Sequence, residues 1–115
     1  MNTTAYTYHI PVLVDEVLEY LNPKPHGIYI DCTFGGGGHT RAILEKEPTC
    51  QVIAMDWDLK ALELNSDKLI EEFGDRVQFI WGNFAQIELK LKPFKLEHID
   101  GILADFGTSQ YQIKE

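Results

Sequence analysis

The 115-residue sequence predicts an α/β fold built around a mostly parallel sheet of about four strands. Four apolar segments of strand length alternate with segments whose apolar residues recur at helical spacing. The strand-like segments are almost continuously apolar, which is typical of strands covered on both faces in a parallel sheet. This alternation indicates βαβ units, and the length fits one domain.

The first expected element is a helix over residues 12–21, preceded by a polar tail of residues 1–10. Pro11 can stand in its first turn, where the missing N–H costs nothing. Four apolar residues then share one helical face: Leu13, Val17, Leu18 and Leu21. Two prolines and a glycine in segment 22–27 end this helix, and the domain is expected to span residues 11–115.

Four strands then alternate with three further helices. The expected strands are residues 28–33, 51–56, 76–81 and 99–105, and the expected helices are residues 39–46, 58–73 and 84–91. Asp58 is suited to cap the start of the second of these helices, and Gly74 to stop it. Cys32, inside the first strand segment, is expected to be a small buried apolar side chain.

Composition excludes several function classes. The net charge of −8 argues against this segment alone gripping a phosphate backbone. Cys32 and Cys50 do not form a C-x-x-C pair, so neither a zinc site nor a disulfide framework is predicted, and no metal is expected. The first nine residues do not resemble a signal peptide, and no apolar run approaches the ~20 residues that span a bilayer. We therefore expect a cytoplasmic protein without membrane segments.

Four consecutive glycines, Gly35 to Gly38, lie between the first predicted strand and the next helix. Glycine tolerates positive φ in a tight turn and lets a ligand approach the backbone. The helix that follows directs free N–H groups and a partial positive charge toward this loop. The loop predicts a nucleotide-type cofactor, with Gly35 and Gly36 forming the turn.

Polar residues at the ends of the later strands extend this site. Asp56 ends the second strand, where a carboxylate can accept hydrogen bonds from ribose hydroxyls. Phe84 follows the third strand, where its ring can pack on adenine, and Asp105 ends the fourth. Both NAD and S-adenosylmethionine contain an adenosine that would fit this edge of the sheet. The residues after the third and fourth strands favour S-adenosylmethionine, and NAD remains the alternative.

Five motifs resemble the bacterial ribosomal RNA small-subunit methyltransferase H family: HIPVL at 9–13, GIYID at 27–31, TFGGGGH at 33–39, DWD at 56–58 and DGILADFGTS at 100–109. The resemblance implies a Rossmann-like fold, S-adenosyl-L-methionine as cofactor, and methylation of a cytosine N4 in small-subunit ribosomal RNA. The residues it assigns to the cofactor are Gly37, Gly38, His39, Asp56, Phe84, Asp105 and Gln112.

Members of this family are longer, with a helical insert and a C-terminal half that are absent here. We therefore expect a truncated chain that carries the cofactor-binding part of the enzyme. Asp105 is the candidate to accept the proton of the target amine, and the small ribosomal subunit is the expected partner. Two alternatives remain: a fragment of a NAD-dependent oxidoreductase, and a non-catalytic binding module. A homodimer that covers the open edge of the sheet is compatible with each.

Overall fold

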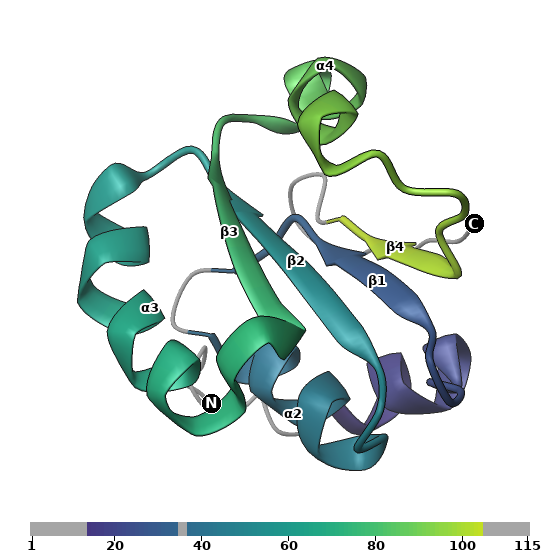
Figure 1. The fold of residues 1–115 in the computed structure, drawn as a ribbon. Coiled ribbons are helices and arrows are strands. Elements are labelled where there is room, and N and C mark those ends of the chain that lie inside the picture. Colours follow the sequence, from purple (N-terminus) through teal and green to yellow (C-terminus); the bar gives the residue numbers. More distant parts are fainter. Residues whose placement is uncertain (1–13, 35–36, 105–115) are drawn as a thin grey trace, which may run out of the picture.

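The structure, a computed structural model, describes residues 14–34 and 37–104 of the chain. Its centre is a four-stranded parallel sheet with the order β3-β2-β1-β4 (Figure 1). The strands are β1 (Ile28–Asp31), β2 (Gln51–Asp56), β3 (Val77–Trp81) and β4 (Gly101–Leu103). The predicted α/β fold with a parallel sheet is confirmed.

Three helical segments pack on one face of the sheet. They are residues 14–21, α2 (Gly38–Lys46) and α3 (Leu59–Phe73) (Figure 1). Buried side chains from α2, α3 and the strands form one apolar cluster there: Tyr29, Phe34, Ile43, Leu44, Cys50, Val52, Ala54, Leu62, Leu69 and Val77. Leu18 and Leu21 pack against it from the first helix, as their helical spacing predicts.

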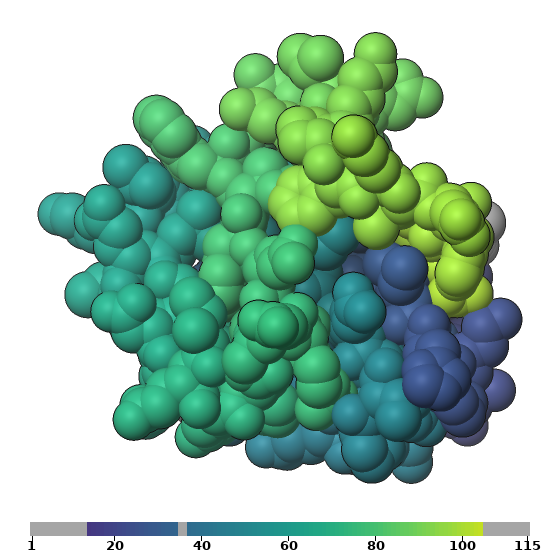
Figure 2. Space-filling view, viewed as in Figure 1, coloured from purple at the N-terminus to yellow at the C-terminus, as the bar shows by residue number. Residues whose placement is uncertain are grey.

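The opposite face is covered by α4 (Ile87–Leu91) and the segment after it. A second cluster of Ile30, Ile53, Met55 and Ile80 lies beneath this segment. The atoms of α4 form a ridge at the top of the molecule in the space-filling view (Figure 2). Two short 3-10 turns, Phe84–Gln86 and Lys92–Phe94, flank α4, so the predicted helix 84–91 is regular only in its second half. Within the described residues no helix is both long and apolar enough to cross a membrane.

Side-chain hydrogen bonds explain where several elements begin and end. Asp58 caps α3 by accepting a hydrogen bond from the Lys60 N–H (3.0 Å), as predicted. β1 ends two residues before the predicted Thr33, because the Asp31 carboxylate accepts the Thr33 N–H (2.8 Å) and turns the chain. β4 covers only the central part of the predicted segment 99–105.

Arg76, predicted to open the third strand, instead ends a 3-10 turn (Gly74–Arg76) that precedes β3. Its guanidinium donates hydrogen bonds to the backbone carbonyls of Leu44 (2.6 Å), Glu47 (2.7 Å) and Cys50 (2.9 Å). The first two carbonyls lie at the C-terminal end of α2, where backbone acceptors lack helical partners. Arg76 thus ties the end of α2 to the start of β3.

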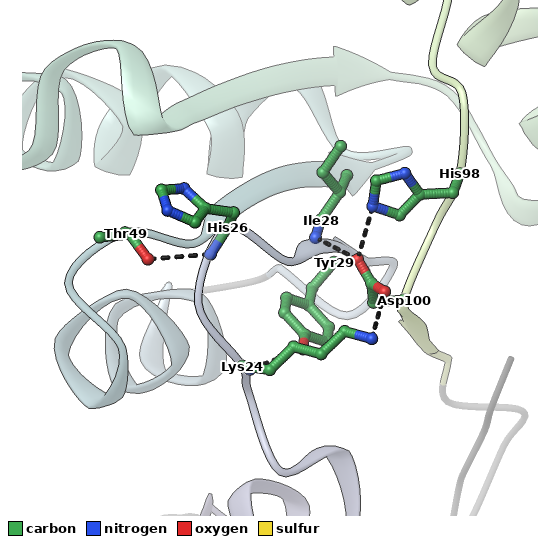
Figure 3. A network of polar contacts seen from close by, with 7 residues as sticks. All are labelled: Lys24, His26, Ile28, Tyr29, Thr49, His98 and Asp100. Carbon is green, nitrogen blue, oxygen red and sulfur yellow. Dashed lines mark hydrogen bonds and ion pairs between the residues drawn. The ribbon is translucent and has the colours of Figure 1, made fainter.

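At the amino ends of β1 and β4, the Asp100 carboxylate interacts with three polar partners (Figure 3). It accepts a hydrogen bond from the Ile28 N–H (2.9 Å) and forms ion pairs with Lys24 and His98, each at 3.1 Å. The Asp100 side chain is only 10% exposed. This cluster fixes the amino edge of the sheet, opposite the edge where the predicted site residues lie.

Candidate cofactor-binding site

The parallel register brings the carboxyl ends of β1, β2 and β3 to one edge of the sheet. Asp31, the last residue of β1, pairs with Ala54, so β2 extends two residues further to Asp56. Asp56 in turn pairs with Trp81 at the end of β3, and its carbonyl accepts a hydrogen bond from the Gly82 N–H (3.0 Å). The loops after these strands, which carry most of the predicted site residues, are therefore neighbours.

Gly37 forms the tight turn between β1 and α2. Its φ of 90° lies in the left-handed region, and it caps α2, whose first residue is Gly38. Its N–H donates to the Phe34 carbonyl (2.6 Å). A Cβ at this position would come within 3.3 Å of the Leu69 and Phe34 side chains. The turn was predicted at Gly35 and Gly36, which lie outside the described residues, and the described glycine with a left-handed conformation before α2 is Gly37.

Phe34 anchors this loop in the core. The ring is 1% exposed and meets the Phe79 ring edge to face, with centroids 5.3 Å apart. The contact between Phe34 and Phe79 therefore fixes the backbone just before the glycines.

A fully buried carboxylate, Asp31, binds both flanks of the glycine turn. Its Oδ1 accepts hydrogen bonds from the Thr33 N–H (2.8 Å) and hydroxyl (2.7 Å), before the glycines. Its Oδ2 accepts the hydroxyl of Thr40 (2.6 Å), in the first turn of α2. Neither Asp31 nor Thr40 has measurable exposure.

His39 lies directly after the turn, in the first turn of α2. Its Nδ1 is 3.3 Å from the Thr33 hydroxyl oxygen. Its Nε2 is buried and has no hydrogen-bond partner among residues 14–34 and 37–104. Because buried polar atoms are nearly always paired, this nitrogen marks a position that a ligand can complete.

Asp56 and Phe84 lie on the other side of the edge. The Asp56 carboxylate accepts a hydrogen bond from the Asp58 N–H (2.9 Å), which orients it at the start of α3. The Phe84 ring is 40% exposed and opens the 3-10 turn after β3. The structure thus brings Gly37, Gly38 and His39 to the end of β1, Asp56 to the end of β2, and Phe84 to the loop after β3.

Two other predicted site residues, Asp105 and Gln112, lie outside the described residues. Within the described part of the chain, no group of three or more His, Cys, Asp or Glu side chains is arranged to hold a metal ion.

Cys32 lies near the same edge, in the turn after β1, although it was predicted to lie inside the strand. Its side chain is partly buried. Burial, and then the nearby Asp31 charge, raises the pKa of Cys32 to about 12, so its thiol stays protonated at neutral pH.

Sequence reasoning missed two features of this edge. The first is the role of Asp31, although an Asp followed two residues later by Thr is a recognisable turn signal. The second is a pair of exposed indoles: Trp57 is 75% exposed and Trp81 57%, and the Trp81 Nε1–H donates to the Trp57 carbonyl (2.9 Å). They are the only tryptophans in the sequence, so both indole fluorophores lie beside the candidate site.

Comparison with known proteins identifies a family that the chain matches. The model of the MraW methylase family matches residues 6–115. A ribosomal RNA small subunit methyltransferase H from Thermotoga neapolitana is 46% identical over 107 residues, which are 93% of this chain and 35% of the relative. The protein of the same name from Finegoldia magna is 44% identical, over 93% of this chain and 34% of its own length. The chain thus spans about a third of these relatives.

Solved structures share the fold at low sequence identity. TrmN from Thermus thermophilus superposes with a TM-score of 0.60 at 22% identity, over 69% of this chain and 24% of that protein. An rRNA methylase from Streptococcus thermophilus gives 0.55 at 20% identity, over 68% and 45%. A geranyl diphosphate methyltransferase in complex with SAM gives 0.56 at 20% identity, over 63% and 29%. The sheet is therefore that of Rossmann-like methyltransferases.

Proposed function

The chain belongs to the MraW methylase family, and we propose that its residues 11–115 form the S-adenosylmethionine-binding part of an enzyme that methylates a cytosine N4 in small-subunit ribosomal RNA. The observation that carries this proposal is the left-handed turn at Gly37, followed by His39 in the first turn of α2. This turn follows β1, and Asp56 ends the neighbouring strand β2. The name that the relatives share supports RNA of the small subunit as the substrate class.

The residues of this edge fit the proposed cofactor. The positive φ of Gly37 excludes most other residues from this turn, and its missing Cβ lets Phe34 and Leu69 pack against the backbone that leads into α2. The buried His39 Nε2 supplies an unused polar atom at the same place. A neighbour with this fold is described as a complex with SAM, which supports the choice of cofactor.

We assign the parts of the cofactor by the chemistry of each strand end. Asp56 would accept the ribose hydroxyls, and Phe84 would pack against adenine on the side of β3. The methionine part would then extend over β1 toward Gly37, Gly38 and His39. This order follows from the sequence of side chains along the edge, since β1, β2 and β3 are consecutive neighbours.

S-adenosylmethionine, when bound, supplies an electrophilic methyl group on its sulfonium sulfur. The chain's task is to orient that group for in-line attack and to exclude water, which are positioning effects. We propose that Asp105, outside the described residues and next to the buried Ala104, accepts the proton that the cytosine amine releases. A target cytosine in structured RNA would have to leave its base stack to reach this edge.

Titration calorimetry with S-adenosylhomocysteine and NAD tests the cofactor. We expect S-adenosylhomocysteine to bind and to change the fluorescence of Trp57 and Trp81, and NAD to have no effect. Binding of NAD alone would instead favour the oxidoreductase alternative. Asp56→Ala should weaken S-adenosylhomocysteine about 10-fold or more, the effect of losing a hydrogen bond to a charged group. Asp67→Ala, which removes an exposed carboxylate of α3, is the matched control and should leave affinity unchanged.

The substrate is tested separately with tritiated S-adenosylmethionine and small ribosomal subunits that lack the modification. The proposal predicts label in N4-methylcytidine after digestion to nucleosides. A chain that binds S-adenosylhomocysteine and transfers no label would instead act as a cofactor-binding module. Label in a different nucleoside would contradict the cytosine N4 assignment.

A further inference from the structure

The Thr33 hydroxyl connects the buried Asp31 carboxylate to the imidazole of His39. The hydroxyl oxygen is 2.7 Å from Asp31 Oδ1 and 3.3 Å from His39 Nδ1. The Thr33 hydroxyl is the hydrogen-bond partner of His39 Nδ1, and Nε2 has no partner among the described residues. Within this part of the chain, Thr33 is therefore the group that can set the tautomer of the ring.

The directions of these hydrogen bonds follow from counting protons. Asp31 Oδ1 also accepts the Thr33 N–H, so this oxygen is an acceptor and the Thr33 hydroxyl donates to it. A threonine hydroxyl has a single proton, which leaves only its lone pairs for His39. His39 Nδ1 must then carry a proton and donate it to Thr33. In the neutral ring, Nε2 is left with a lone pair.

We propose that Thr33, held by Asp31, is a positioning residue that fixes His39 in the Nδ1–H tautomer, so that Nε2 accepts a hydrogen bond from the α-ammonium group of the bound cofactor. This inference rests on the function proposed above. An ammonium only donates hydrogen bonds, so an Nε2–H tautomer could not bind it. The cofactor's carboxylate, which only accepts, is better matched by backbone N–H groups at the start of α2.

Thr33 and Thr40 form a matched pair for the test. Both hydroxyls donate to Asp31 at similar distances, 2.7 Å to Oδ1 and 2.6 Å to Oδ2. Only Thr33 also reaches His39. Replacing either threonine with valine keeps the shape of the side chain and removes one hydrogen bond to Asp31. A general weakening of the buried network would therefore appear in both variants, and a change of tautomer in Thr33→Val alone.

The tautomer is measured in the free protein by long-range proton–nitrogen NMR of the histidine rings at pH 8. His39 is assigned among the four histidines with a His39→Gln variant. We expect Nδ1–H in the wild type, in Thr33→Ser and in Thr40→Val, and Nε2–H in Thr33→Val. Nε2–H in the wild type, or the same tautomer in Thr33→Val as in the wild type, would overturn the inference without touching the proposed function.

Calorimetry with two ligands then tests the ammonium contact. S-adenosylhomocysteine has the amino group, whereas 5′-methylthioadenosine lacks the amino-acid part. We expect Thr33→Val to weaken S-adenosylhomocysteine by about 10-fold, the scale of one lost hydrogen bond, and to leave methylthioadenosine unchanged. Thr33→Ser should restore the affinity. Equal losses for both ligands would overturn the assignment of the ammonium group, and failure of the wild type to bind either ligand would overturn the proposed function.

Discussion

Replacing Gly37 with alanine tests whether the turn before α2 needs a glycine. The residue has φ 90° and ψ 6°, a left-handed conformation that costs an L-residue about 1–2 kcal/mol. The new Cβ would also lie 3.3 Å from side-chain atoms of Leu69 and Phe34, which must shift to admit it. Alanine lowers the entropy of the unfolded chain, which returns about 0.4–1 kcal/mol. With the crowding adding about 1 kcal/mol, we expect a net loss of about 1–2.5 kcal/mol.

Urea unfolding followed by circular dichroism measures this change in the free energy of unfolding. In thermal unfolding, the midpoint temperature should fall by roughly 5–10 °C. Gly38→Ala is the matched control. Gly38 is the first residue of α2 and is exposed, so alanine there should leave stability unchanged or raise it slightly. If Gly37→Ala were as stable as the wild type, the left-handed turn would not be a fixed feature of the folded chain.

Two further predictions concern the rest of the fold. Burial alone would raise the pKa of Asp100, but the Ile28 N–H bond and the Lys24 charge outweigh it and lower this pKa. A carboxyl with a lowered pKa stabilises the fold above its usual value of about 3.9 and loses that contribution as pH falls through the folded-state pKa. Urea unfolding should therefore show stability declining below about pH 4, less steeply in Asp100→Asn. Arg76→Met leaves three carbonyls without their donor and should lower the free energy of unfolding by about 2–4 kcal/mol in the same assay. Arg76→Lys should recover only part of this stability, because an ammonium group cannot reproduce the geometry of the guanidinium. Full recovery in Arg76→Lys would contradict this explanation.

The sequence predicted those features whose signals are local. The strand at residues 51–56 has the predicted bounds, and Asp58 caps α3 as its position indicated, because strand periodicity and capping depend on adjacent residues. Strand ends were less accurate. β1 stops at Asp31 because that side chain bonds the backbone two residues on, which competes with the ladder.

The candidate site was predictable as a set of positions and not as a network. Gly37, His39 and Asp56 follow consecutive predicted strands, so a parallel sheet brings them to one edge. The shared use of Asp31 by residues on both sides of the glycines could not be read from spacing, because it depends on how α2 returns against β1. The unpaired Nε2 of His39 is likewise a property of the folded packing.

The Asp31 network would favour ligand binding by a loop that is rich in glycine. Glycines give the backbone access to conformations that other residues avoid, but they also raise the entropy that binding must remove. Asp31 holds Thr33 on one side of the glycines and Thr40 on the other, and the buried Phe34 anchors the chain between them. The residues that flank the glycines are thus fixed before any ligand arrives, which would lower the entropic cost of binding. A buried carboxylate is expensive to desolvate, and its three hydrogen bonds at this one turn offset that cost.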